Sequence, residues 1–173
     1  MFGSSDPDDS VYALDARNGK LVWRFQTKIT APDQDVGAAP TISRPGVNGF
    51  HHGVVYINGK DNIEYAIDLL TGKEIWEFNL QKSSGGAAAT SQSAAALIGR
   101  RIAVPYGRYV FALDATTGAQ AWRSDPASGS YFSSPSVSGA PVDQVVVVGD
   151  DAGDERGYRA SDGSPVLCRT VRR

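Results

Sequence analysis

The sequence has little surplus charge of either sign. Its 173 residues include 17 Lys and Arg against 19 Asp and Glu, so the formal net charge is -2. Binding to nucleic acid or to an anionic bilayer needs a surplus of basic side chains that neutralise phosphate groups. The balance therefore argues against nucleic acid as a partner. With 41% hydrophobic and 21% charged residues, the composition is that of an ordinary globular protein.

Cysteine and histidine are scarce as well. A single cysteine, Cys168, excludes a disulfide within the chain, and one thiol with only two histidines argues against a tetrahedral zinc site. We expect Cys168 to be a packed or surface residue. The chain also has no Gly-x-Ser-x-Gly elbow, Walker loop or His-Glu-x-x-His motif, so no motif supports hydrolase or nucleotide chemistry.

Long apolar runs are missing. The alanine-rich stretch 85–99 is interrupted by Thr90, Ser91, Gln92 and Ser93, so we expect no membrane span. Residues 1–6 lack the basic and apolar regions of a secretory signal. If the protein is exported, we expect the signal to lie outside this sequence.

A motif of the form Ala-x-Asp-x-x-x-Gly-x-x-x-Trp occurs three times at unchanged internal spacing. All three tryptophans of the chain stand at one position of this motif, a coincidence too large for background composition. The motif residues are Asp15, Gly19 and Trp23; Asp68, Gly72 and Trp76; and Asp114, Gly118 and Trp122. The chain is therefore a repeat protein.

The sequence around each motif predicts four short strands per repeat, because runs of β-branched and aromatic residues alternate with turn residues. In the second repeat the strands are predicted at 40–43, 54–57, 63–68 and 74–80, and in the third at 93–97, 101–104, 109–114 and 119–123. A fourth, degenerate repeat is predicted at 135–138, 145–148, 157–163 and 166–167, with Arg159 in place of the Asp and Leu167 in place of the Trp. The first repeat begins at Phe2, at the end of its second strand.

Four strands per repeat, a period of 46 to 53 residues between motif Asp residues and no helical periodicity predict an all-β fold, an incomplete β-propeller of four-stranded antiparallel blades. The blades are predicted at about 2–27 (half a blade), 38–80, 91–125 and 133–171. Strands such as 109–113 are apolar on both alternate faces, as expected for a sheet that is covered on both sides.

Each motif residue has a mechanical explanation. Glycine supplies the positive φ of a hairpin loop, and the Asp carboxylate can accept hydrogen bonds from backbone N–H groups of that loop. The indole is expected to be buried against small residues of its own motif and of the next blade. We therefore interpret the nine motif residues as a structural docking motif rather than as a site of chemistry.

These residues resemble the pyrrolo-quinoline quinone (PQQ) repeat, the blade of the quinoprotein alcohol dehydrogenase-like superfamily. The resemblance extends from Gly3 to about Val171. It implies a propeller that is usually eight-bladed and a periplasmic or extracellular location. Catalytic members, the quinoprotein alcohol and glucose dehydrogenases, share the motif with non-catalytic members such as the bacterial outer-membrane barrel-assembly lipoprotein. The resemblance therefore specifies the blade and leaves the activity open.

The resemblance implies how a cofactor is held in the catalytic members. There the quinone lies between a tryptophan and a ring of two adjacent bonded cysteines, and calcium is bound by acidic and amide side chains. The adjacent cysteine pair is absent here, and all three tryptophans stand at docking positions. The segment 23–40 resembles the loop that leads from a blade to the central funnel. Its Gln26, Asp33 and Asp35 are candidate ligand residues, although two carboxylates in such a loop also fit solvated turn residues.

Other polar clusters are explained by turns. Acidic residues at 6–9 and 150–155 fall at the same hairpin of their repeats, with 60–62 as a short counterpart, and hairpin tips favour Asp, Asn and Gly. Their spacing does not match an EF-hand loop. His51 and His52 lie in an insertion at 44–53 and are expected to be exposed. We assign no catalytic or metal-ligating residue.

The sequence thus favours a non-catalytic scaffold that binds a protein or a small ligand through loops around the funnel. The alternative is a fragment of a PQQ-dependent alcohol or sugar dehydrogenase, with PQQ and calcium as cofactors. An incomplete propeller has open edges, which predict contact with further blades or self-association. Function is expected in segments that do not repeat: 26–35, 44–53 and 81–91.

Overall fold

The computed structural model describes residues 2–3, 9–28, 36–46, 50–86, 89, 93–140 and 142–170, which form four antiparallel sheets in chain order. Blade 1 contains β1 (Phe2–Gly3), β2 (Ser10–Leu14) and β3 (Leu21–Gln26). Blade 2 contains β4 (Thr41–Ile42), β5 (Val54–Asn58), β6 (Ile63–Asp68) and β7 (Glu74–Asn79). Blade 3 contains β8 (Ala96–Ile98), β9 (Arg101–Tyr106), β10 (Tyr109–Asp114) and β11 (Gln120–Arg123). Blade 4 contains β12 (Ser136–Ser138), β13 (Val145–Gly149), β14 (Asp154–Arg159) and β15 (Pro165–Thr170).

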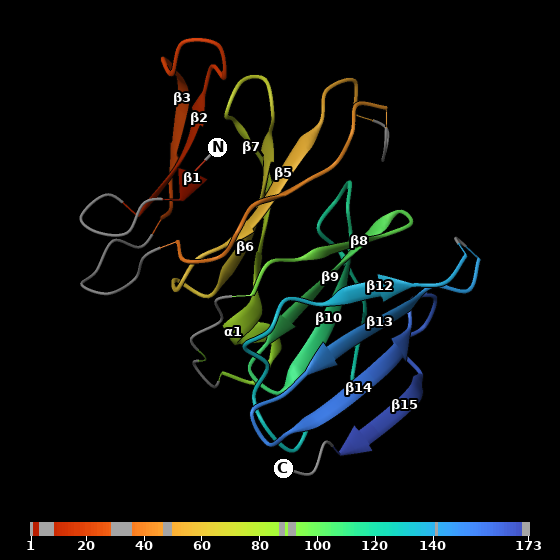
Figure 1. Ribbon diagram of the computed structural model, residues 1–173. Coiled ribbons are helices and arrows are strands. Elements are labelled where there is room, and N and C mark those ends of the chain that lie inside the picture. Colours follow the sequence, from red (N-terminus) through yellow and green to blue (C-terminus); the bar gives the residue numbers. More distant parts are fainter. Residues whose placement is uncertain are drawn as a thin grey trace.

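The four blades follow one another as a fan, with blade 1 at one end and blade 4 at the other (Figure 1). Within each four-stranded blade every strand pairs with the next one along the chain. The first strands of blades 3 and 4, β8 and β12, contact each other, so first strands lie at the inner edge of the fan. The predicted all-β, incomplete propeller is confirmed, and the ring is not closed.

Several element boundaries differ from the prediction; in blade 3, for example, β8 occupies Ala96–Ile98 rather than 93–97, and β9 continues to Tyr106. The last strand of blade 2 ends at Asn79, and Leu80–Ser83 form a one-turn helix, α1, whose Lys82 N–H donates to the Asn79 side chain at 2.8 Å. Leu80 is buried, so an apolar residue expected in the strand instead anchors this turn. In blade 4, β14 starts at Asp154 and β15 continues to Thr170, because hairpin pairing extends into the acidic turn.

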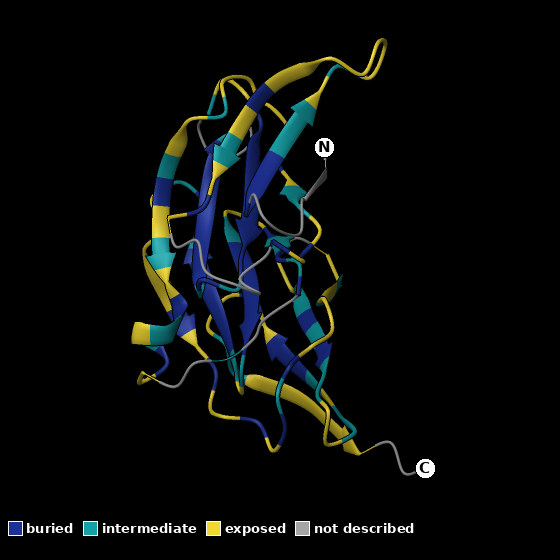
Figure 2. Ribbon diagram, turned by 90° about the vertical axis from the view of Figure 1, so that its left-hand side faces the viewer, coloured by how far each residue is buried: buried dark blue, intermediate teal, exposed yellow. Residues whose placement is uncertain are grey.

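The middle strands are covered on both faces. Four or more consecutive residues are buried in β5, β6, β9 and β10, whereas all six residues of β15 are exposed (Figure 2). Three apolar cores lie between successive blades and draw residues from both neighbours. The blades are therefore held together by packing of sheet faces.

Each tryptophan contacts the following blade in the same way. In each case the indole Nε1 donates a hydrogen bond to a backbone carbonyl of the next blade. The acceptor is the residue that follows the motif Asp, or that follows Arg159 in blade 4. The distances are 2.9 Å from Trp23 to Leu69, 3.2 Å from Trp76 to Ala115 and 3.0 Å from Trp122 to Ala160. The indole also covers the hairpin glycine of that blade. A Cβ on Gly72, Gly118 or Gly163 would lie 2.6 to 2.7 Å from ring atoms, so the close approach requires glycine.

The motif carboxylates cap the same hairpins. Asp114 Oδ1 accepts hydrogen bonds from the backbone N–H groups of Thr116 and Thr117, both at 2.9 Å, and Asp68 Oδ1 does the same for Leu70 and Thr71. These bonds, together with the Thr117 hydroxyl, lower the pKa of Asp114 against the opposing effect of burial. Hydrogen bonds within the hairpin therefore explain the role of these carboxylates.

Candidate functional site

The hairpins between second and third strands and the connections between blades lie at one end of the sheets, here called the hairpin face. The connections run along the hairpins through backbone hydrogen bonds: Leu80 donates to Asn62 at 2.9 Å, and Tyr131 to Gly107 at 2.7 Å. Residues of the connections after blades 2 and 3 and of the hairpins of these two blades are thereby gathered at this end. Apart from Gln26, which ends β3, the described residues of the non-repeating segments 26–35 and 81–91, two of the segments in which function was predicted, belong to the connections between blades.

At the blade 2 hairpin a buried Asp61 fixes its neighbours. Its carboxylate accepts hydrogen bonds from the Tyr65 hydroxyl at 2.5 Å and from the Ile63 N–H at 3.2 Å. Tyr65 in turn accepts from the N–H of Lys28, which ties the connection from blade 1 to this hairpin. Burial raises the pKa of Asp61, and burial together with the Asp61 carboxylate raises the pKa of Tyr65.

The polar group in the deepest position is formed by Asn58, Glu64 and Ser93, here called the Glu64 cluster. Asn58 and Glu64 stand opposite each other on β5 and β6, and the Asn58 side-chain N–H donates to the Ser93 carbonyl at 2.9 Å. All three residues are at most 1% exposed. A carboxylic acid in such a place is costly, because burial disfavours its ionised form.

The pKa of Glu64 reflects this cost. Burial raises it from 4.5 to about 8, and the nearby charge of Asp61 adds to the rise. Asn58, which lies close by without meeting hydrogen-bond geometry, offsets part of it. Glu64 is therefore a group that can take up and release a proton near neutral pH.

A cavity of about 340 Å³ opens beside this region on blade 3. Tyr106 stands at its edge: its hydroxyl donates to Asn62 Oδ1 at 2.7 Å and accepts from the Ala89 N–H at 3.1 Å. The cavity is lined by Ser84, Ala89, Tyr106, Gly107, Arg108, Tyr109 and Ser130. The lining combines hydroxyl, aromatic and guanidinium groups from two connections and one hairpin.

Arg108 lines this cavity, and Arg123 packs on the Tyr109 side chain that forms part of its wall. Arg108 Nε donates to the Ala127 carbonyl, and Arg123 donates to the Ser83 carbonyl at 2.6 Å with its guanidinium 4.7 Å from the centre of the Tyr109 ring. These contacts hold both side chains in place beside the opening. The cavity is thus built from ordered groups rather than from loose surface chains.

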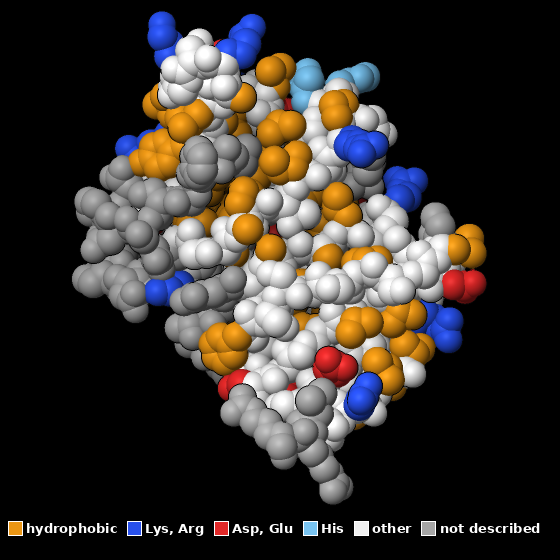
Figure 3. Space-filling model, in the orientation of Figure 1, with side chains coloured by type: hydrophobic (Ala, Val, Ile, Leu, Met, Phe, Trp, Pro, Cys, Tyr) orange, Lys and Arg blue, Asp and Glu red, His pale blue; other side chains and the backbone are white. Residues whose placement is uncertain are grey.

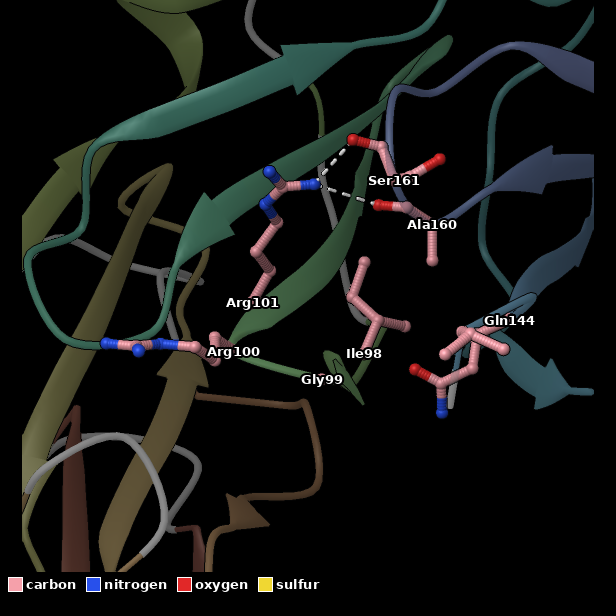
Figure 4. A pocket seen from close by; sticks show the side chains of 8 residues that line it. Ile98, Gly99, Arg100, Arg101, Gln144, Ala160 and Ser161 are labelled. Carbon is pink, nitrogen blue, oxygen red and sulfur yellow. Dashed lines mark hydrogen bonds between the residues drawn. The ribbon is translucent and has the colours of Figure 1, made fainter. Parts of the chain in front are cut away.

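A second cavity, of about 190 Å³, lies at the opposite end of blades 3 and 4 (Figure 4). Arg101 reaches toward blade 4 and donates to the carbonyls of Ala160 and Ser161 at 3.1 and 2.6 Å, while Arg100 extends away from them. The Ala160 carbonyl also accepts from Trp122. Arg101 is therefore committed to the contact between blades rather than to a ligand in this cavity.

The structure does not group the described candidate residues from the sequence into one site. Gln26 is exposed on β3, where its side chain accepts from Arg24 at 3.4 Å; Asp33 and Asp35 lie outside the described residues. His51 and His52 are exposed, and His52 Nδ1 lies 3.5 Å from an Asp68 oxygen. Nothing in the described part of the chain brings these residues together.

The acidic turn of blade 4 is held by local bonds. Asp150 Oδ1 accepts from the N–H groups of Ala152 and Asp154 at 3.1 and 2.9 Å, and Arg156 approaches Asp154 at 3.1 Å. Among the described residues no three His, Cys, Asp or Glu side chains are grouped as a metal site would need. Cys168 is exposed.

The sequence analysis missed the Glu64 cluster and Tyr106. A signal was available, because Glu64 occupies the repeat position held by Val11 in blade 1 and Val110 in blade 3, both fully buried. A glutamate in a valine position breaks the repeat pattern without benefit to packing. Asn58 and Ser93 carry no comparable signal, since their burial depends on how blades 2 and 3 pack.

The described residues do not fit a quinone of the kind that the family resemblance implies. All three tryptophans are inserted between blades at 8% exposure, and Cys168 is the single cysteine of the chain. A quinone held between a tryptophan and a cysteine ring cannot be built from them. We therefore derive no reaction step through this cofactor.

Antiparallel sheets arranged as a fan, with each tryptophan inserted into the following sheet, define a segment of a β-propeller with PQQ-type repeats. The chain belongs to the family whose model is described as "Outer membrane protein assembly factor BamB", which matches residues 7–173. The family therefore covers nearly the whole sequence.

Curated relatives include dehydrogenases. The chain is 32% identical over 120 residues to a quinohemoprotein alcohol dehydrogenase of Comamonas testosteroni, covering 65% of this chain and 16% of that protein. It is 29% identical over 127 residues to the quinohemoprotein alcohol dehydrogenase ADH-IIG of Pseudomonas putida, covering 69% and 17%. The chain thus spans about one sixth of the length of these relatives.

Solved structures of a BamB protein and of a dehydrogenase show the same fold. BamB from Moraxella catarrhalis matches with a TM-score of 0.67 at 17% identity, over 98% of this chain and 46% of that chain. The Comamonas testosteroni quinohemoprotein alcohol dehydrogenase matches with a TM-score of 0.69 at 19% identity, over 93% and 32%. Among the residues that the structure describes, no helix has the length and apolar character needed to cross a bilayer.

Proposed function

We propose that this chain is part of a non-catalytic propeller that binds a protein or a small ligand at the hairpin face. The observation that carries the proposal is the cavity of about 340 Å³ beside Tyr106. Part of its wall, Ser84 and Ala89, comes from the non-repeating segment 81–91, whereas the repeated motif residues are occupied by hairpin capping and blade contacts. Binding residues are commonly carried by loops on a rigid scaffold.

The lining of this cavity favours a polar or aromatic ligand group. Tyr109 contributes an aromatic ring, Ser130 a hydroxyl group and Arg108 positive charge. The Ser84 hydroxyl already donates to the Gln81 carbonyl at 2.8 Å. A concave site with a few fixed polar groups and an aromatic wall is typical of ligand recognition. A peptide segment or a small polar molecule would suit it.

The second candidate is a fragment of a quinone-dependent alcohol or sugar dehydrogenase. It is favoured by the curated relatives, which are dehydrogenases with about 30% identity to this chain. Under this alternative the full protein would bind PQQ and calcium and would act in the periplasm or outside the cell.

Titration with PQQ in the presence of calcium chloride separates the two candidates. We expect no saturable change in tryptophan fluorescence and no dye-linked oxidation of an alcohol or a sugar, since all three indoles are inserted between blades. The control is a full-length quinohemoprotein alcohol dehydrogenase under the same conditions. Saturable binding with substrate oxidation would support the dehydrogenase and refute the scaffold.

The open face of blade 1 is the surface we propose for a further blade. Tyr12 and Leu14 stand at the repeat positions of the fully buried Phe111 and Leu113, yet Leu14 is 37% exposed. A Cβ added to Gly19 would meet no atom within 4 Å, unlike one on its three counterparts beneath indoles. Hydrophobic side chains gather on this part of the surface (Figure 3). A blade with an outer-strand tryptophan fits this face.

Leu167→Trp tests whether the blade 1 face accepts an indole. Leu167 occupies the tryptophan position of blade 4 and is 43% exposed. We expect the variant to self-associate, with concentration-dependent mass in light scattering, because its new indole can reach Gly19 of another copy. Adding Leu14→Glu should abolish this association, whereas adding Val142→Glu, at an exposed site elsewhere, should not. A monomeric variant, or association that survives Leu14→Glu, would refute the proposed docking face.

A further inference from the structure

The Glu64 cluster contains four buried oxygen atoms without a hydrogen-bond partner among the described residues. They are both carboxylate oxygens of Glu64, the amide oxygen of Asn58 and the hydroxyl oxygen of Ser93. Buried polar atoms are nearly always paired, and an exception calls for a bound water, an ion or a function. Four such atoms in three neighbouring side chains call for one shared explanation.

These atoms belong to one small region between blades 2 and 3. Val54, Tyr56 and Ala66 belong to the core shared with blade 3, and alternation along a strand places Asn58 and Glu64 on that same face of blade 2. Ser93 precedes the first strand of blade 3, and its carbonyl accepts the Asn58 amide N–H. One N–H of the Asn58 amide is thus used and the amide also lies close to Glu64, whereas the four oxygen atoms have no partner among the described residues that meets hydrogen-bond geometry.

Folding does not require these groups. Valine fills the position of Glu64 in blades 1 and 3 and is fully buried there. Exchanging valine for an unpaired glutamate costs stability, because a polar group loses its water without replacement. The cost is offset if something binds to the oxygens.

We propose that Asn58, Glu64 and Ser93 hold a monovalent alkali cation, sodium or potassium, between blades 2 and 3. The donor set consists of oxygen alone, which suits hard cations that exchange hydration water for protein oxygens. Among the described residues, the groups that shift the pKa of Glu64 include no lysine, arginine or histidine, and Asp61 adds negative charge nearby. A cation therefore supplies the charge that this site lacks.

The single carboxylate of the cluster favours a monovalent ion over a divalent one. The cost of removing an ion from water grows with the square of its charge, whereas its attraction to one carboxylate grows only in proportion. Asp61 is not available as a second ligand, because its oxygens accept from Tyr65 and Ile63. One negative charge is therefore best matched by one positive charge.

The test compares thermal unfolding in sodium, potassium and tetramethylammonium chloride at equal ionic strength and at pH 9. We expect sodium or potassium to raise the melting temperature of the unsubstituted chain above that in tetramethylammonium, which is too large to enter. Glu64→Val, which restores the residue of blades 1 and 3, should remove the difference. Glu155→Val is the matched control, since Glu155 holds the same repeat position in blade 4 and is exposed; this variant should keep the difference.

Proton competition gives an independent readout. The pKa of Glu64 is about 8, so below that pH the apparent affinity should fall about tenfold per pH unit as protons displace the cation. Sodium-23 line broadening by the protein should weaken accordingly between pH 9 and pH 6. It should be absent in Glu64→Gln, which keeps the size of the side chain and removes its charge.

Three results would overturn the assignment. One is a melting temperature of the unsubstituted chain that does not distinguish the three chlorides. Another is a cation effect of equal size in Glu64→Val and Glu64→Gln, which would place the ion elsewhere. The third is stabilisation by millimolar calcium chloride with no response to sodium or potassium, which would mean that the site takes a divalent ion.

Discussion

Replacing Trp122 by alanine is expected to lower the free energy of unfolding by about 3 to 5 kcal/mol. The indole is 8% exposed, donates to the Ala160 carbonyl at 3.0 Å and covers Gly163, whose backbone leaves room only for hydrogen. Alanine would leave a cavity between blades 3 and 4, and the Ala160 carbonyl would keep only its hydrogen bond from Arg101. The substitution should therefore weaken the contact between two blades rather than one blade alone.

Equilibrium unfolding in urea, followed by far-ultraviolet circular dichroism, measures this loss. Phe132→Ala is the matched control, because Phe132 is 53% exposed and an aromatic side chain is removed without opening the core. The control should change stability by less than about 0.5 kcal/mol. An unchanged melting temperature in Trp122→Ala would contradict the role we assign to the indole.

The tryptophan motif made the blades predictable from sequence. Asp, Gly and Trp at unchanged spacing locate one hairpin, and strand pairing then follows from the alternation of apolar residues on either side. Strands β6 and β10 have the bounds expected from the sequence, 63–68 and 109–114. Local rules suffice there, because the hairpin and its register depend on residues close in the chain.

Local rules fail where contacts between blades determine the structure and burial of a residue. Leu80 has the character of a strand residue, yet it lies in a helical turn and is buried in the core shared by blades 2 and 3. In the same way Ser93 becomes fully buried only through its position beside Asn58 of the previous blade. Such pairs are distant in sequence, so neither composition nor spacing identifies them.

Glu64 is an intermediate case. Its departure from the valine of blades 1 and 3 is visible in the sequence once the repeats are superimposed, but a glutamate there could have been exposed, as Glu155 is in blade 4. Blade 3 covers Glu64, whereas the corresponding face of blade 4 has no described neighbour. The repeat pattern thus points to the residue, and only the packing of the next blade makes it chemically unusual.

The stability of the chain should fall as the pH rises from about 5 to 8 in tetramethylammonium buffer. Folding raises the pKa of Glu64 from 4.5 to about 8, so within this window the folded state holds a proton that the unfolded chain releases. The free energy of unfolding then decreases with a slope of up to about 1.4 kcal/mol per pH unit and levels off above pH 8. Asp61, whose pKa is also raised by burial, acts in the same direction near the lower limit.

Carboxylates with lowered pKa values do not interfere in that window. Hydrogen bonds hold the pKa of Asp15, Asp114 and Asp154 below the usual 3.8, so these groups lose their stabilising effect only in more acidic solution. Urea unfolding of the unsubstituted chain and of Glu64→Gln at pH 5, 6, 7 and 8 isolates the contribution of Glu64. The amide cannot ionise, so the Gln variant should show a much flatter profile. Equal slopes in the two proteins would show that Glu64 ionises in the folded state as readily as in water.

The same measurement in two salts would link the proton to the bound cation. We expect a flat profile of the unsubstituted chain in sodium chloride and a steep one in tetramethylammonium chloride, because an ion that stabilises the carboxylate removes the reason for its high pKa.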